Sequence, residues 1–162
     1  MKLTLLATLV TMAAAAILAL SSTASAQNRP DFSGTWKLDP ARSQSAVQNE
    51  PITTMTEVIA QTPTTITVDI TRPDGHVVHT YKLDASDATP LPGVGKAHWD
   101  GAILVTEAVG DVNGQTVTTK VVRQLNEIGE MIVETTLVVQ HGYSLRGTPN
   151  YASGKDVFLR VK

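Results

Sequence analysis

Cysteine is absent from the 162 residues of this chain. Disulfide bonds, thiol catalysis and thiolate metal sites are therefore excluded. The acylated cysteine that tethers bacterial lipoproteins is excluded for the same reason. Stability must come from an apolar core, and the length is sufficient for one such core.

Basic residues are few and scattered, with 13 Lys and Arg against 15 Asp and Glu. Nucleic acid is not expected as a partner, because binding the phosphate backbone requires a concentrated positive face. The chain also lacks a basic amphipathic segment of the kind that binds membrane surfaces. Without a Walker loop, a dinucleotide fingerprint or a zinc pattern, the sequence predicts no cofactor and no metal.

One long apolar run is present, at the N-terminus. Lys2 precedes an uncharged run over residues 3–20, and Ala24-Ser25-Ala26 places small residues where signal peptidase requires them. An uncleaved membrane anchor is the alternative, since about 18 apolar residues can just span a bilayer. The Ala-x-Ala pattern favours cleavage before Gln27. We therefore predict a signal peptide over residues 1–26 and a soluble periplasmic or secreted domain over residues 27–162.

The remainder of the chain has the pattern of β-structure. Short runs rich in Thr, Val and Ile alternate in polarity and are separated by turn residues such as Pro73-Asp74-Gly75 and Asn113-Gly114. The expected strands are residues 32–38, 52–61, 64–72, 77–83, 97–99, 102–109, 115–125, 131–140 and 156–161. Eight to nine strands joined by short turns predict an all-β, up-and-down antiparallel barrel, with a β-sandwich as the alternative.

The segment from Asp31 to Ser43, DFSGTWKLDPARS, resembles the opening of secreted bacterial lipocalin-like proteins. Gly34-x-Trp36 is similar to the Gly-x-Trp signature that opens lipocalins of the calycin superfamily. The resemblance implies a barrel in which Trp36 closes one end and a late-strand arginine, here Arg160, lies across the indole. A guanidinium over an indole gains about 0.5–2 kcal/mol of cation–π energy. Gly34, Trp36 and Arg160 are thus expected to have structural roles.

His79 and Tyr81 share a strand face with Val77 and Leu83. If the two apolar residues face the barrel interior, so do the imidazole and the phenol. Inside a barrel, this pair could orient a ligand or act as acid and base. It could equally form a hydrogen-bonded polar pair in a filled core. A shared metal site with His76 is not expected, because residues three apart on a strand point to opposite faces.

Arg123 lies on the more apolar face of its expected strand, beside Val121 and Leu125. An inward arginine could pair with the carboxylate of an acid ligand. The alternative, which we favour from sequence, is an arginine that extends to the barrel rim at the strand end. Trp99 is expected to be core or pocket wall. Glu107 and Glu134 lie in apolar strands of ambiguous register, so a pair of glycosidase-type carboxylates stays open.

The site predicted from sequence therefore consists of His79, Tyr81, Trp99 and Arg123. The leading hypothesis is a periplasmic or secreted barrel that binds a small, largely apolar molecule. The second is a barrel enzyme of isomerase or lyase type that uses acid–base chemistry. The third is an interaction or inhibitor protein that acts through loops at residues 85–95 and 142–154. A hollow interior with convergent polar groups favours the second hypothesis over the third, and a filled interior favours the third.

Overall fold

The computed structural model describes residues 29–46, 52–83, 95–112, 115–141 and 151–162. The predicted signal peptide lies outside the described residues, as does most of the two loops expected at residues 85–95 and 142–154. Within the described part of the chain, no helix is long and apolar enough to cross a membrane.

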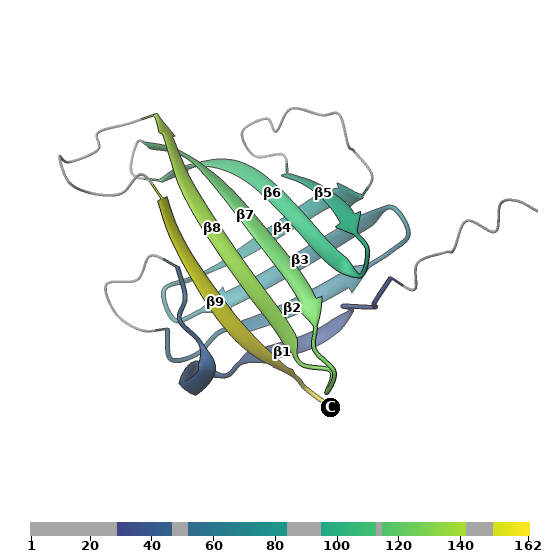
Figure 1. Ribbon diagram of the computed structural model, residues 1–162. Helices are drawn as coiled ribbons and strands as arrows, with labels where there is room; N and C mark the ends of the chain where they lie inside the picture. Colours follow the sequence, from purple (N-terminus) through teal and green to yellow (C-terminus); the bar gives the residue numbers. More distant parts are fainter. Residues whose placement is uncertain (1–28, 47–51, 84–94, 113–114, 142–150) are drawn as a thin grey trace, which may run out of the picture.

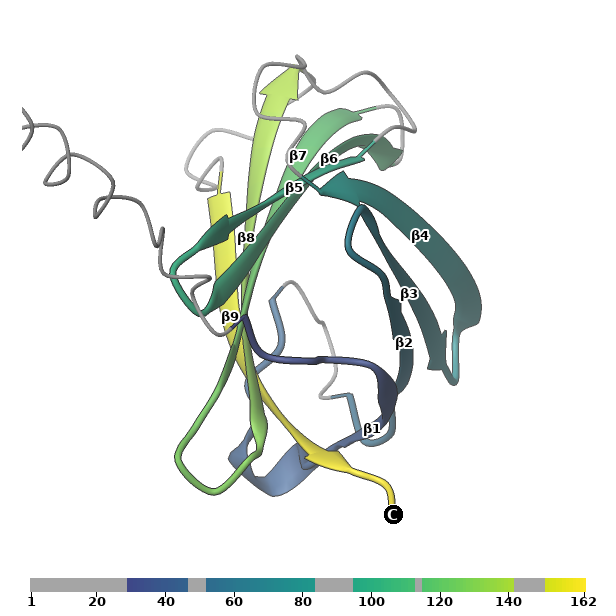
Figure 2. The ribbon, with the colours of Figure 1, turned by 90° about the vertical axis from the view of Figure 1, so that its right-hand side faces the viewer.

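Nine strands form one closed barrel, which confirms the predicted fold class (Figure 1). The strands are β1 (Gly34–Leu38), β2 (Thr56–Gln61), β3 (Thr65–Arg72), β4 (Gly75–Leu83), β5 (Gly95–Asp100), β6 (Ile103–Val112), β7 (Gln115–Leu125), β8 (Met131–His141) and β9 (Tyr151–Arg160). Closure comes from the pairing of β1 with β9, in which Trp36 lies opposite Arg160. Figure 2 shows β2, β3 and β4 across the interior from β6, β7 and β8.

Two details of the barrel differ from the prediction made from the sequence. Strands β4 and β5 run parallel, with Tyr81 opposite Gly95, whereas the other neighbouring strands run antiparallel. Strand β9 begins at Tyr151, five residues earlier than expected, so residues 151–154 are strand rather than loop. The early part of β9 contains Ser153 and Gly154 and lacks an apolar alternation, but it pairs with β8 along its length.

The closed end of the barrel is built around Trp36 and Phe32, both fully buried. The Trp36 indole Nε1 donates a hydrogen bond of 2.8 Å to the Phe32 carbonyl oxygen. The Arg160 guanidinium lies 4.2 Å from the centre of the Trp36 ring and donates to the carbonyl oxygens of Asp31 and Ser33. The contact that the resemblance implies is therefore present, and it joins the end of β9 to the segment before β1.

Gly34 has a backbone reason to be glycine in this arrangement. Its φ is +124°, a conformation that side-chain-bearing residues rarely adopt. A Cβ at Gly34 would also lie 3.1 Å from Nη1 of Arg160, tighter than an ordinary contact. The Gly-x-Trp pattern thus places the indole and leaves room for the guanidinium that covers it.

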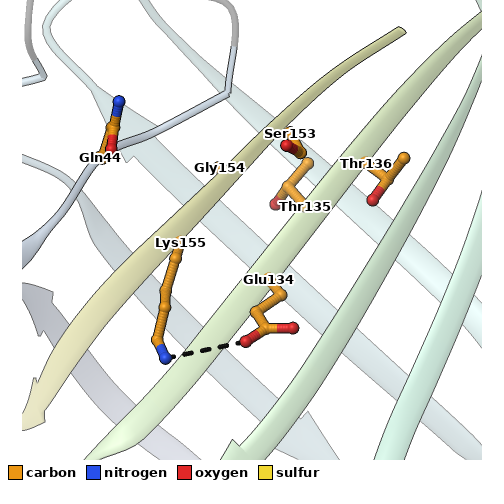
Figure 3. A pocket seen from close by; sticks show the side chains of 7 residues that line it. All are labelled: Gln44, Glu134, Thr135, Thr136, Ser153, Gly154 and Lys155. Carbon is orange, nitrogen blue, oxygen red and sulfur yellow. Dashed lines mark ion pairs between the residues drawn. The ribbon is translucent and has the colours of Figure 1, made fainter.

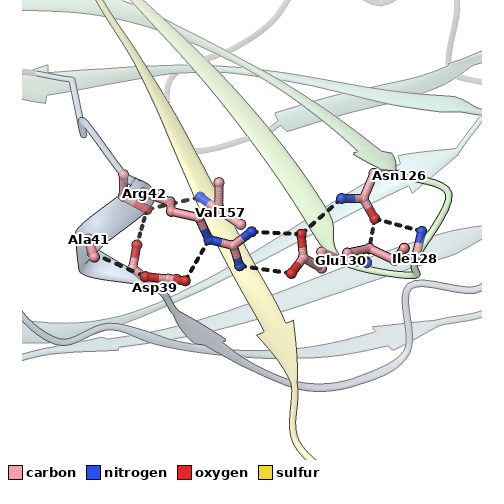
Figure 4. A network of polar contacts seen from close by, with 8 residues as sticks. Asp39, Ala41, Arg42, Asn126, Ile128, Glu130 and Val157 are labelled. Carbon is pink, nitrogen blue, oxygen red and sulfur yellow. Dashed lines mark hydrogen bonds and ion pairs between the residues drawn. The ribbon is translucent and has the colours of Figure 1, made fainter.

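A polar network fastens the short 3₁₀ helix η1 (Pro40–Arg42) to the turn between β7 and β8 (Figure 4). The Arg42 guanidinium donates to both carboxylate oxygens of Glu130, at 3.1 and 2.8 Å, and to Asp39 at 2.7 Å. Asn126 donates to Glu130 at 2.9 Å. The hydrogen bonds from Arg42 lower the pKa of both Asp39 and Glu130. This exposed network fixes the chain as it leaves β1.

Candidate functional site

The predicted face of β4 points into the barrel. Tyr81 is 6% exposed and Leu83 is also buried, while Val77 and His79 are half-buried. The residues between them, Val78 and Thr80 among them, are exposed. The rings of His79 and Tyr81 lie side by side with their centres 6.0 Å apart. Sequence reasoning therefore placed this polar pair on the correct face.

Arg123 is buried, at 3% exposure, and does not extend to the rim. The rim interpretation favoured from sequence is wrong, because a buried acid compensates the guanidinium. Nη2 of Arg123 lies 3.4 and 3.3 Å from the two carboxylate oxygens of Glu57, and Nη1 donates to the Thr106 hydroxyl at 3.4 Å. Glu57 is as buried as its partner. Removing two charges from water is costly unless they are paired, and here they are.

Together, these contacts link polar side chains from several strands into one continuous chain across the barrel interior. Tyr81 on β4 is hydrogen-bonded to Thr106 on β6, Thr106 accepts from Arg123 on β7, and Arg123 contacts Glu57 on β2. We call Glu57, Tyr81, Thr106 and Arg123 the internal polar chain. Four strands contribute one residue each, so the internal polar chain can form only when these strands have come together in the barrel.

The internal polar chain leaves one strong donor unused. Nε of Arg123 is buried and has no hydrogen-bond partner among the described residues. The contacts that Arg123 does make, at 3.3–3.4 Å, are longer than the usual 2.7–3.2 Å for N–H···O. A buried donor without a partner costs about 1–3 kcal/mol. The site is therefore held loosely and has an unsatisfied donor within an apolar interior.

Burial sets the protonation states of the two neighbouring rings. Desolvation lowers the pKa of His79, and the positive charge of Arg123 lowers it further. Desolvation raises the pKa of Tyr81. At neutral pH both rings are uncharged, and each can donate or accept one hydrogen bond.

Gly95 makes room for the phenol ring. It lies opposite Tyr81 in the parallel β4–β5 pair. A Cβ at Gly95 would overlap the ring carbons Cδ1 and Cε1 of Tyr81. The glycine that begins β5 therefore permits the ring to occupy its inward position.

Trp99 is half-buried and belongs to a different neighbourhood. Its ring stacks on Phe32, with 6.0 Å between ring centres, and the Arg29 guanidinium lies 5.5 Å from it. Trp99 also lines a hollow of about 370 Å³ beside the N-terminal segment, together with Arg29, Asp31, Ser33, Gln61, Thr62, Pro63 and Leu83. The structure places Trp99 against Phe32 at the closed end, and not with the rings of His79 and Tyr81.

A second hollow, of about 400 Å³, lies over β8 and β9 (Figure 3). Its lining includes Glu134 and Lys155, which form an ion pair of 3.8 Å and are both exposed. Glu107 likewise pairs with Lys96, at 3.1 Å, across the β5–β6 ladder. Because Thr106 faces inward, its neighbour Glu107 faces outward. The two glutamates that the sequence left open as a catalytic pair are thus outer-surface residues.

Sequence reasoning missed Glu57, Thr106 and the buried Asp156. The strand around Glu57 alternates Met55, Glu57 and Ile59 with Thr56 and Val58, so hydrophobicity alone does not decide its face. The one signal in the sequence is Arg123 itself, because a buried guanidinium requires a buried acid; this signal predicts that such an acid exists and does not single out Glu57. Among the described residues, no group of three His, Asp or Glu side chains could hold a metal ion.

Comparisons with known proteins give structural likeness without a sequence family. No protein-family model matches the chain, and no curated protein matches it. The wild-type fluorescent protein UnaG is similar at 23% identity and a TM-score of 0.49, over 80% of this chain and 97% of UnaG. A point mutant of UnaG gives 22% identity and a TM-score of 0.49, over 81% and 96%. The REP1-NXSQ fatty acid transporter gives 11% identity and a TM-score of 0.42, over 82% and 97%.

Proposed function

We propose that this protein is a periplasmic or secreted lipocalin-like barrel that binds a small, largely apolar molecule in its interior. The observation that carries the proposal is the internal polar chain with the unpaired Nε of Arg123. A purely structural barrel gains nothing from a buried donor that lacks a partner. Ligand sites, by contrast, are mostly apolar cavities with a few convergent polar groups.

The partial exposure of inward-facing residues indicates that a ligand can reach the internal polar chain. On β4, Val77 and His79 face inward beside the buried Tyr81, and both retain partial exposure. On β7, Thr119 and Val121 share the face of the buried Arg123 and are also half-buried. Solvent therefore reaches side chains on the inner wall next to the polar chain. A molecule that replaces this solvent would bury apolar surface and supply a partner for Nε.

Binding accounts for the same residues better than acid–base catalysis does. Glu57 is engaged by Arg123, and the raised pKa of Tyr81 keeps its phenol protonated. A general base requires a free acceptor with a pKa near the working pH. Burial lowers the pKa of His79 and weakens it as a base. The described groups thus favour holding a molecule over transforming it.

The test is a fluorescence titration with Nile red, an uncharged probe of apolar sites. The wild-type protein is expected to bind it, and His79→Ala and Tyr81→Phe are expected to weaken binding about fivefold, the effect of losing one hydrogen bond or ring contact. Thr80→Ala is the matched control, since Thr80 lies between the two on the outer face. Absence of binding by the wild type, or equal affinity in all four folded proteins, would refute the proposal.

A further inference from the structure

We infer that the interior is selective for a ligand whose polar group is a neutral hydrogen-bond acceptor, such as an amide or ester carbonyl, rather than a carboxylate. This inference rests on the binding function proposed above and specifies its ligand class. It follows from the charges that the barrel already buries and from the donor that it leaves unused.

The charges already buried in the barrel disfavour a ligand that carries a negative charge. Among the described residues, the buried ionisable groups with side chains that carry charge are Glu57, Arg123 and Asp156. They comprise two carboxyls and one guanidinium. The Arg123–Glu57 pair, at 3.3 Å, is already neutral as a unit. A carboxylate ligand would bring a further negative charge next to Glu57 in a medium of low dielectric constant, where like charges repel strongly.

The geometry leaves a place for one acceptor. The guanidinium presents Nη2 to Glu57 and Nη1 to Thr106, while Nε is unpaired. A guanidinium binds a carboxylate best through two parallel N–H···O contacts. Both Nη nitrogens of Arg123 already have a partner, so Nε is the guanidinium nitrogen left without one among the described residues, and its single N–H suits one carbonyl or hydroxyl oxygen. Tyr81 belongs to the internal polar chain through its hydrogen bond with Thr106, and its phenol is uncharged.

The neighbouring ring supplies no compensating charge. His79 lies beside Tyr81 with 6.0 Å between ring centres, and it sits near enough to Arg123 for the guanidinium to oppose its protonation. Arg72, on the inward-facing side of β3, pairs with Asp74 at 3.3 Å. Cations that could neutralise a ligand carboxylate are thus engaged or absent from the described inner wall around the polar chain.

The test compares decanamide with decanoate, which share an apolar chain and differ in the charge of the polar group. Each displaces Nile red at about pH 7.5, where decanoate is ionised. We expect the wild-type protein to bind decanamide at least about tenfold more tightly than decanoate. In Glu57→Gln, which leaves the charge of Arg123 uncompensated, we expect the preference to reverse in favour of decanoate. Glu107→Gln removes a carboxylate from the outer face and is expected to keep the wild-type preference.

The outcomes separate the two proposals. Equal or tighter binding of decanoate by the wild type would overturn the neutral-acceptor inference while leaving the binding function intact. An unchanged preference in folded Glu57→Gln would overturn it as well. Failure of both Nile red and decanamide to bind would refute the binding function and this inference together. If Glu57→Gln does not fold, which circular dichroism reveals, the wild-type comparison decides.

Discussion

Asp156 is a buried carboxyl that forms no ion pair with any basic side chain in the described part of the chain. It is 5% exposed, lies in β9, and accepts a hydrogen bond of 2.6 Å from the Ser45 hydroxyl. Burial raises the pKa of Asp156 above its ordinary value of 3.8, and the Ser45 hydrogen bond offsets part of the rise. Ser45 belongs to a segment that pairs with β9 through Gln44 and Lys155. The carboxyl thus couples that segment to the barrel wall.

The raised pKa gives a prediction for stability against pH. Because native Asp156 holds its proton more tightly than the unfolded chain does, its contribution to stability falls as pH rises from about 3.8 through the native pKa. Asp156→Asn keeps a side chain that accepts from Ser45 and removes the charge. We expect it to raise Tm by about 2–6 °C at pH 7.5 and to have little effect near pH 3.5.

The control for this prediction is Asp74→Asn, which changes an exposed carboxyl in the β3–β4 turn. Thermal melts followed by circular dichroism at both pH values measure the effect. A destabilisation by Asp156→Asn at pH 7.5 equal to that at pH 3.5 would show that the charge of this residue carries no cost.

At the scale of elements, the strands were predictable where one face is apolar and the other polar. Strand β7 has the bounds expected from its alternation, because burial of one face sets the pattern. The early part of β9 was not predictable in this way. A Cβ at Gly154 would collide with the backbone of residues 44–46, so the glycine is required by a neighbouring segment, and its turn-like composition conceals a strand. The parallel direction of β5 relative to β4 has no signal in the alternation of polar and apolar residues along either strand.

The candidate site was predictable to the same extent. Alternation along β4 placed His79 and Tyr81, since their neighbours Val77 and Leu83 are apolar. The partner of Arg123 was not predictable, because Glu57 is 66 residues away and meets it only across the closed barrel. Long-range pairing of charges leaves no trace in a local pattern.

The contacts of Arg160 with Trp36 and with the segment before β1 form a seal at the closed end of the barrel. Arg160, at the end of β9, covers the Trp36 indole and ties down the segment before β1 through its carbonyl oxygens. Arg160→Ala removes the stack and both hydrogen bonds and is expected to cost about 1–2 kcal/mol of unfolding free energy. Arg160→Lys keeps the charge without the planar fork and is expected to recover only part of the loss. Equilibrium unfolding in urea measures both; identical midpoints for all three proteins would contradict the role of the seal.

For the whole molecule, closure of the sheet explains how a cysteine-free chain of this size holds together. The pairing of β1 with β9 removes the sheet edges, and a cluster around Phe32, Trp36 and Phe158 fills one end. The segment before β1 is part of this end: Gln61 accepts from the backbone N of Phe32 and donates to the carbonyl of Pro30. The segment from Arg29 to Phe32 therefore makes contacts that belong to the folded barrel.

This use of the N-terminal segment bears on the proposed export of the protein. Cleavage before Gln27 would keep each of the contacts made by Arg29, Pro30, Asp31 and Phe32. Cleavage a few residues later would remove Arg29 from Trp99 and Pro30 from Gln61. A signal peptide that ends at Ala26 is thus compatible with the complete closed end of the barrel.

We accordingly expect the full-length chain, expressed in a bacterial host, to yield a soluble exported protein that begins at Gln27. Intact-mass measurement of the periplasmic fraction and the medium checks both the localisation of the protein and its cleavage site. Ala26→Leu places a large residue where the peptidase requires a small one, and it is expected to leave the precursor uncleaved and membrane-associated. Recovery of the wild-type chain with Met1 in the membrane fraction would instead identify residues 3–20 as a retained anchor, because a run of that length can just cross a bilayer.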